Sequence, residues 1–259
     1  PLSRSINAAL ERVASLGTYL VLSQSETDAQ SFLESRVIPP ARLRVIGNGV
    51  DLARFDPARI PPKARAATRR ALGIGDDEVV AIFSGRLVRE KGVEEVCQAA
   101  VRLQGKVRVV FAGRDDAERR DPPDPGLIEA AKRAGALFLG HRTDMPELYG
   151  AADVVGLASW REGMPRCLIE GATMAKPLLA SNIRGCRDIV RDGVTGLLFP
   201  VRDVDALSAA LQRLAGDEAL RTRLGSAARE DARGRFDIHA VVARVVRAYD
   251  DLLLRRGIS

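Results

Sequence analysis

The chain has 259 residues and a mass of 28.0 kDa, with 46% hydrophobic residues and a formal net charge of +6 that comes mainly from arginine. This length allows one large domain or two small ones, and the hydrophobic content is ample for a buried core. The three cysteines have neither metal-binding nor redox spacing. Their odd number argues against a disulfide framework.

The positive charge suits a phosphate-bearing ligand or an anionic membrane surface. Nucleic acid is the general alternative for a basic protein. Because the sequence has no basic stripe interleaved with aromatic residues and no nucleic-acid-binding motif, we expect no such partner. No signal peptide and no apolar run of about 18 residues is present, so we expect that the chain neither enters nor spans a membrane by itself.

The N-terminal part of the chain is predicted to alternate between helices and strands. The helices are expected near Arg4–Ser15 and Glu26–Ser35, and the strands near Thr18–Leu22 and Arg42–Ile46. The Pro-rich piece that follows, Asp56–Pro62, is typical of a loop.

From Val79 onward, short apolar runs alternate with helical patterns, which indicates βαβ units and a parallel sheet flanked by helices. The predicted strands are Val79–Ser84, Val107–Ala112, Ala136–Leu139, Asp153–Ala158, Pro177–Ala180 and Gly196–Phe199. The intervening helices are expected at Val93–Leu103, Asp124–Ala134, Met145–Tyr149, Arg166–Met174 and Cys186–Val190. Three more helices follow, at Val204–Leu214, Glu218–Arg233 and Ile238–Leu254. The fold class is therefore α/β with a Rossmann-like sheet.

The first candidate site lies after the first strand of this sheet. Gly85 and Arg86 fall in the predicted turn, and Lys91 and Gly92 open the next helix. Arg offers a planar fork that matches phosphate oxygens, Lys adds a mobile charge, and a helix start favours anions. The loop is neither a Walker P-loop nor a G-x-G-x-x-G turn. Taken alone, these two cations are surface charges.

The second candidate site is EGMPRCLIE, in which Glu162 and Glu170 flank seven residues after the strand Asp153–Ala158. Glu162 is expected at the carboxyl end of the strand, where parallel sheets bind ligands, and Glu170 inside the next helix. Gly163 lets a ligand approach the backbone, and Pro165 suits the first turn of the helix. Each glutamate by itself would be a solvated residue; their spacing and context favour a site.

A third stretch, Leu139–Val154, contains the turn before the strand that leads to Glu162. Asp144 is expected to cap the helix there, with Pro146 in its first turn and Glu147 at the third position. His141 is predicted to be a loop residue that touches a ligand rather than a general base.

These motifs together resemble the nucleotide-binding half of retaining glycosyltransferases of family 4, which have the GT-B fold. The matching stretches are VIGNGVDLARFDP (Val45–Pro57), FSGRLVREKG, REGMPRCLIEGATMAKPLLAS (Arg161–Ser181) and DIVRDGVTGLLFP (Asp188–Pro200). They follow the order and spacing of the family. The resemblance implies transfer of a sugar from a nucleotide diphosphate-sugar with retention at the anomeric carbon.

The resemblance also implies roles for single residues. Arg86 and Lys91 would hold the diphosphate, Glu162 would lie by the donor sugar, and Glu170 would bind the ribose hydroxyls. We assign catalytic roles to the first three. The other donor-binding residues implied are Gly85, the segment Gly163, Met164, Pro165 and Arg166, and, near the base, His141 and Arg142.

Two basic residues at the diphosphate remove the need for a divalent metal, so we expect neither a metal nor a cofactor. The loops offer no suitable Asp-x-Asp pair. The sequence leaves open whether Glu162 forms a covalent sugar intermediate or the leaving phosphate assists attack from the same face.

The resemblance divides the chain into three parts: residues 1–50, a remnant of the acceptor-binding domain with its hinge; residues 51–235, the donor-binding domain; and residues 236–259, a helix that crosses back to the remnant. Most of the acceptor domain would be missing. Apolar side chains of the remnant are expected to pack on the last helix or to mark a dimer or partner interface. These are Val13, Leu16, Tyr19, Val21, Leu33 and Val37.

The function expected from the resemblance is a UDP-dependent hexosyl- or N-acetylhexosaminyltransferase, acting on a glycan or lipid-linked sugar in bacterial surface polysaccharide synthesis. Its expected place is the cytoplasm, with peripheral attachment to the inner membrane face. The stretch Ser181–Gly196 carries the resemblance to such members, although its Gly equally suits a structural turn. The alternative is a non-catalytic nucleotide-sugar-binding subunit that needs a partner acceptor domain. A sugar-nucleotide epimerase or a pyridoxal-phosphate phosphorylase has less support, because the residues that each requires have no match.

Overall fold

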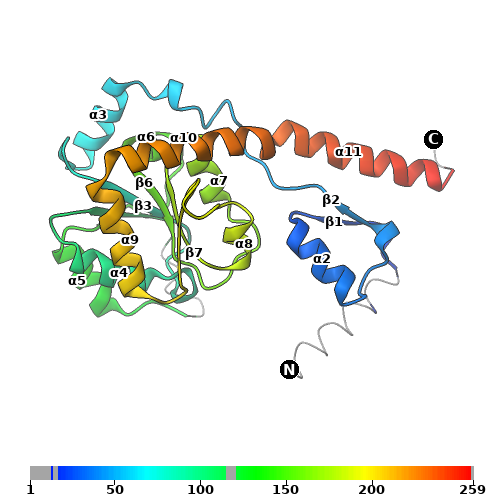
Figure 1. The fold of residues 1–259 in the computed structure, drawn as a ribbon, viewed down its shortest axis with the longest axis horizontal. Coiled ribbons are helices and arrows are strands. Elements are labelled where there is room, and N and C mark those ends of the chain that lie inside the picture. The colour runs from blue at the N-terminus through cyan, green and yellow to red at the C-terminus, as the bar shows by residue number, and fades with distance from the viewer. Residues whose placement is uncertain (1–12, 14–16, 115–120, 258–259) are drawn as a thin grey trace. The chain divides into compact units, whose positions relative to one another are not determined.

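The structure is a computed structural model that describes residues 13, 17–114 and 121–257 of the chain. It separates into two compact units, a smaller one formed by Pro1–Val50 with Arg235–Ser259 and a larger one formed by Asp51–Gly234 (Figure 1). Each unit is described by itself.

The larger unit is built on a six-stranded parallel sheet in the order β5-β4-β3-β6-β7-β8. Its strands are β3 (Val80–Ser84), β4 (Arg108–Ala112), β5 (Leu137–Phe138), β6 (Val154–Leu157), β7 (Leu178–Ser181) and β8 (Gly196–Phe199). All six lie within the predicted runs, apart from the one-residue extension of β7 to Ser181. The apolar runs are continuous because both faces of a parallel sheet are buried under helices. The predicted α/β fold class is confirmed.

Helices cover both faces of this sheet (Figure 1). On one face, α4 (Val93–Arg102) packs against α5 (Pro125–Arg133) and α9 (Val204–Gly216), and their apolar side chains share a core with alternate strand residues such as Phe83 and Phe111. On the other, α6 (Met145–Ala151) lies on β3, and α7 (Arg166–Thr173) lies on β6 and β7. The remaining elements are η3 (Arg89–Lys91), α8 (Arg184–Arg187) and α10 (Glu218–Arg235).

The Pro-rich piece is not simply a loop, so this prediction is wrong. Pro57–Arg59 forms a short 3₁₀ helix, η2, whose first turn is capped by the Asp56 carboxylate, which accepts from the Ala58 amide at 3.1 Å. Pro62 then opens a helix that the sequence reading missed, α3 (Pro62–Ala71), which packs against α6. Proline is compatible with both positions because a first-turn residue needs no amide hydrogen.

Most other helix boundaries differ from the prediction by one or two residues, and two of these differences lie near predicted site residues. Pro165 is the residue before α7 rather than part of its first turn. Helix α8 begins at Arg184 and ends at Arg187, earlier than the predicted Cys186–Val190. Such shifts are common at the frayed ends of short helices.

The smaller unit pairs two short parallel strands, β1 (Val21–Ser23) and β2 (Leu43–Val45), beside α2 (Glu26–Glu34) and η1 (Pro40–Arg42). The first strand starts later than Thr18, where it was predicted, and the predicted helix Arg4–Ser15 lies outside the described residues apart from Val13. The chain ends in α11 (Ile238–Arg255), whose start is tied to Val50 by two backbone hydrogen bonds of 2.9 and 3.1 Å.

Of the N-terminal apolar residues that were expected to pack on the last helix, Tyr19 has its ring centroid 3.4 Å from the guanidinium carbon of Arg256, the residue that caps the end of α11. Val21 and Val37 instead join a local cluster with Ala29, Ile38 and Leu43. Val13, Tyr19 and Leu33 are exposed, and Leu16 lies outside the described residues. The short sheet forms its own core because α2 covers it directly.

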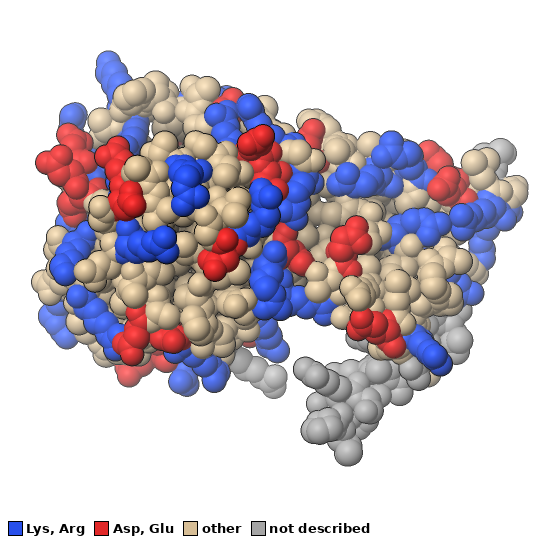
Figure 2. Space-filling model, viewed as in Figure 1, with Lys and Arg blue, Asp and Glu red and all other residues tan. Residues whose placement is uncertain are grey.

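Lysine and arginine are spread over the face shown in Figure 2 and are interspersed with acidic residues. Within the described ranges, none of the helices combines the length and the apolar character needed to cross a membrane.

Candidate functional site

The strand order places a natural ligand site at the carboxyl ends of β3 and β6. These two strands are neighbours, and the chain continues from β3 toward β4 and from β6 toward β7, on opposite sides. Such a switch point leaves a crevice between the loops that follow the two strands. A cavity of about 470 Å³ lies there.

The cavity brings together most of the predicted site residues. It is lined by Gly85, Arg86, Lys91, His141, Arg142, Glu162, Pro165, Arg166 and Glu170. Gly163 and Met164 do not line it.

The loop after β3 is shaped by two glycines with positive φ. Gly85 has φ 149° and Gly92 has φ 72°, conformations that favour glycine. A Cβ on Gly92 would lie 2.1 Å from the Ala158 carbonyl oxygen, so this glycine lets the loop approach the end of β6 closely. Lys91 is the last residue of η3, and α4 begins only at Val93, which corrects the prediction that Lys91 opens the helix.

The Glu162 loop is joined to this first loop. Lys91 Nζ lies 2.5 Å from Glu162 Oε1, which also accepts a hydrogen bond from Ser159 Oγ at 2.6 Å. The Trp160 amide donates to the Glu90 carbonyl oxygen at 2.8 Å. The Lys91 and Glu162 side chains are 21% and 14% exposed. Their ion pair therefore lies at the wall of the cavity and remains accessible from it.

Glu170 lies within α7 and reaches the cavity from the other side. Its Oε2 accepts a hydrogen bond from Tyr149 Oη at 3.2 Å, and its Oε1 lies 3.9 Å from Arg166 Nη2. Burial raises the pKa of the Glu170 carboxyl, while Arg166, Tyr149 and Arg54 act to lower it. A half-buried carboxylate with few fixed partners is suited to accept hydrogen bonds from a ligand.

The loop between β5 and α6 closes a third side of the cavity. His141 is exposed, and Arg142 forms a two-pronged ion pair with Asp144, at 2.8 Å for Nε to Oδ1 and 2.5 Å for Nη2 to Oδ2. This pair lowers the pKa of Asp144. Asp144 precedes α6 as predicted, but its carboxylate makes no capping hydrogen bond, because Arg142 occupies it. Pro146 and Glu147 take their predicted places in the first turn.

Sequence reasoning missed several residues of the cavity wall, including Ser84, Arg114, Met145, Tyr149 and Cys167. The sequence did contain a pattern that could have identified Arg114 as a residue of this cavity. The segments FSGR (83–86) and FAGR (111–114) end neighbouring strands in exact register, with Phe83 opposite Phe111. The second glycine, Gly113, allows the two loops to touch, since a Cβ there would lie 1.6 Å from the Gly85 carbonyl oxygen.

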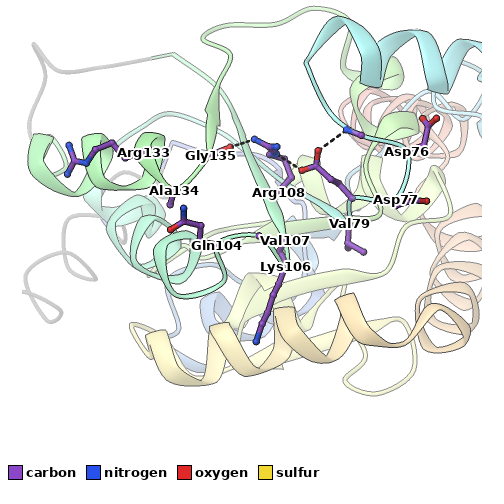
Figure 3. A pocket seen from close by; sticks show the side chains of 13 residues that line it. Asp76, Asp77, Val79, Gln104, Lys106, Val107, Arg108, Arg133, Ala134 and Gly135 are labelled. Carbon is purple, nitrogen blue, oxygen red and sulfur yellow. Dashed lines mark hydrogen bonds and ion pairs between the residues drawn. The ribbon is translucent and has the colours of Figure 1, made fainter.

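A larger cavity, of about 590 Å³, lies at the opposite edge of the sheet, where β3 and β4 begin (Figure 3). Arg108 crosses it, pairing with Glu78 at 2.7 Å and donating to the Gly135 carbonyl oxygen at 2.9 Å. In Figure 3 the basic side chains of Lys106 and Arg133 point in different directions rather than toward one another. The Arg108 guanidinium at the centre of this cavity is therefore already bound to groups at the edge of the sheet. Among the residues that the structure describes, no group of three or more His, Cys, Asp or Glu side chains could hold a metal ion.

Comparison with known proteins adds the family. The model for "Glycosyl transferases group 1" matches residues 64–231. D-inositol 3-phosphate glycosyltransferases are similar in sequence: that of Salinispora arenicola is 30% identical over 251 residues, covering 92% of this chain and 56% of the relative. That of Mycobacterium marinum is 32% identical over 200 residues, covering 75% and 41%. The chain therefore spans about half the length of the curated relatives it matches.

Solved structures show a similar fold. HepE of Anabaena, in complex with UDP and glucose, superposes with a TM-score of 0.83 at 24% identity, covering 94% of this chain and 67% of that one. Sucrose-phosphate synthase of Thermosynechococcus elongatus gives a TM-score of 0.84 at 25% identity, covering 97% and 62%. With its six-stranded parallel sheet, its cavity at the switch point and the family match across most of the larger unit, the chain belongs to the group 1 glycosyl transferases and has the GT-B type of fold.

Proposed function

We propose that the larger unit binds a nucleotide diphosphate-sugar, UDP-linked, and that the protein transfers its sugar with retention of anomeric configuration. The observation that carries the proposal is the meeting of Arg86, Lys91, Glu162 and Glu170 at one cavity, although they come from two separate loops and a helix. HepE, a structural neighbour, was solved with UDP and glucose, which supports UDP as the nucleotide.

Different side chains of the cavity would bind different parts of the donor. Lys91 has three ammonium donors, of which one faces Glu162, so the others are available to phosphate oxygens. Together with Arg86 it would stabilise the negative charge that grows on the leaving diphosphate, which is commonly the largest electrostatic contribution to such a reaction. Glu162 beside Lys91 would face the donor sugar, and Glu170 would accept from the ribose hydroxyls.

The acceptor belongs to the same proposal. We propose a glycan or lipid-linked sugar, reached at the cytoplasmic membrane face, as in bacterial surface polysaccharide synthesis, with a hexose or N-acetylhexosamine as the transferred sugar. The names of the curated relatives favour a competing acceptor, D-inositol 3-phosphate. Assays of the protein with each acceptor and each UDP-sugar distinguish the two. The configuration of the product, read by proton NMR of its anomeric signal, tests retention.

Calorimetry with UDP tests the core of the proposal. Because Arg86 and Lys91 line the same cavity and would supply two cations to a diphosphate, we expect UDP to bind with EDTA present, and with an affinity that added magnesium does not improve. Uridine should bind more weakly, since it carries no diphosphate. A folded sample that fails to bind UDP at millimolar concentration would refute the donor-site assignment.

A further inference from the structure

Two hydroxyl groups lie next to Glu170, one on the buried Tyr149 and one on the partly buried Ser84. Tyr149 on α6 is among the largest fully buried side chains of the protein. Its Oη lies 2.8 Å from Ser84 Oγ at the end of β3 and donates to Glu170 Oε2 at 3.2 Å. Three elements, β3, α6 and α7, thus meet through one phenol oxygen.

The phenol is fixed by packing and not only by these hydrogen bonds. Its ring is fully buried and lies 6.2 Å from the Phe55 ring in a tilted arrangement. A buried phenol hydroxyl needs a polar partner, and Ser84 with Glu170 supplies two. Tyr149 contacts Oε2, while the other carboxylate oxygen, Oε1, lies 3.9 Å from Arg166 Nη2.

We propose that Tyr149, supported by Ser84, is a positioning residue that holds the Glu170 carboxylate ionised and oriented toward the ligand in the donor cavity. This inference rests on the proposed function, in which Glu170 binds the ribose. A hydrogen bond donated to a carboxylate favours its charged form. Removing the phenol hydroxyl should therefore let Glu170 take up a proton at higher pH, and a protonated carboxyl accepts ribose hydroxyls less well.

Several charged and ionisable groups surround Glu170. The charged groups that act on it are Arg166, on its own helix, and Arg54, on the segment before η2. The charge of Glu170 also acts on the Cys167 thiol, but burial is the main reason that the pKa of this thiol is raised to about 12. The Glu170 carboxyl is therefore followed through its own NMR signal, which distinguishes it from His141 and Glu162, two other ionisable side chains that line the same cavity.

The test compares the wild-type chain with Tyr149→Phe, which keeps the ring and deletes the hydroxyl. Uridine affinity is measured by calorimetry from about pH 4.5 to pH 8, and Glu170 is followed directly through its carboxyl carbon NMR signal without ligand. Tyr149→Phe is expected to move the acid midpoint of Glu170 to higher pH and to weaken uridine binding about three- to tenfold near the midpoint, the size of one hydrogen bond. The loss should shrink as the pH rises.

Controls make the outcomes distinct. Ser84→Ala should move the acid midpoint of Glu170 in the same direction, but by less. If Tyr149→Phe is unstable, Ser84→Ala serves as the test variant. Tyr249→Phe also deletes a phenol hydroxyl, but at an exposed position on α11, and should change nothing. Glu170→Gln should bind uridine weakly and independently of pH.

An unchanged midpoint and pH profile in both Tyr149→Phe and Ser84→Ala would overturn the inference while leaving the proposed function intact, provided that Glu170→Gln still weakens uridine binding. If the wild-type chain binds neither UDP nor uridine, the proposed function fails and the inference fails with it.

Discussion

At the scale of single residues, the cavity combines two carboxylates whose surroundings differ. Glu162 is held by Lys91 and Ser159 through one oxygen, whereas Glu170, which is buried to a similar extent, contacts a neutral phenol and has a pKa that burial raises. The first carboxylate thus has its counter-charge at 2.5 Å, whereas the arginine paired with the second, Arg166, lies 3.9 Å away. This difference is consistent with one group beside the leaving diphosphate and the other beside neutral hydroxyls.

The different roles predict different responses to uridine and UDP. Glu170→Ala should weaken both ligands, because both carry the ribose. Arg86→Ala and Lys91→Ala should weaken UDP by about tenfold to over a hundredfold, the effect of losing a charge-assisted hydrogen bond, and should leave uridine nearly unchanged. Calorimetry with both ligands on the three variants measures this. Equal losses of uridine affinity in all three would contradict the assigned roles.

At the scale of elements, the Glu162 loop is supported from behind by α8. A Cβ on Gly185 would lie 1.9 Å from the Gly163 carbonyl oxygen and 2.6 Å from that of Glu162. Gly185→Ala should therefore displace the loop, lower the free energy of unfolding by roughly 1–3 kcal/mol and weaken donor binding. Gly163→Ala is the matched control for stability, because the space around Gly163 is open. Thermal unfolding that is the same for both variants would contradict the packing argument.

Helix α3 is held to the sheet by a buried arginine. Arg69 donates to the carbonyl oxygens of Ala151 at 2.9 Å and Gly75 at 2.7 Å and contacts Asp153, whose Oδ2 also accepts from the Val80 amide. Its side chain is 3% exposed.

Arg69→Ala should lower the free energy of unfolding by roughly 3–5 kcal/mol, because Asp153 and several carbonyls lose a buried donor. Arg65 contacts the same carboxylate at 2.6 Å but is 37% exposed, so Arg65→Ala should cost only about 0–1 kcal/mol. Urea unfolding of both variants measures these losses. An equal loss in the free energy of unfolding would show that the burial of Arg69 does not explain its contribution to stability.

At the scale of the whole molecule, transfer requires more than a donor site. The acceptor hydroxyl must be held against the anomeric carbon, and such positioning contributes about 7–11 kcal/mol to lowering a barrier. The curated relatives that this chain matches are about twice as long as the chain itself. We expect these 259 residues to bind UDP-sugar and hydrolyse it slowly, without efficient transfer. A paired assay of this chain and of a relative that spans the whole family length, with a lipid-linked sugar acceptor, tests this, and efficient transfer by the 259 residues alone would refute it.

The sheet and the positions of the candidate site residues could be predicted because the necessary signals are local. Apolar runs such as Val79–Ser84 and Asp153–Ala158, each followed by a glycine-containing turn, mark buried strands and their carboxyl ends. The spacing of Glu162 and Glu170 placed one on a loop and the other in a helix, as observed. Helix α3 was missed because it is rich in arginine and its anchor, Arg69, finds its partners only in the folded chain.

The sequence by itself thus determined the α/β class, the order of the elements and which side chains follow which strand. The reason is that the spacing of apolar residues and the residue types of the turns are properties of consecutive residues. Tertiary structure alone decided that Lys91 pairs with Glu162, that Asp144 holds Arg142 instead of capping α6, and that Tyr149 and Ser84 stand behind Glu170. Most of these contacts join residues from different elements. They depend on strand order, register and the seating of each helix, and no local pattern specifies these.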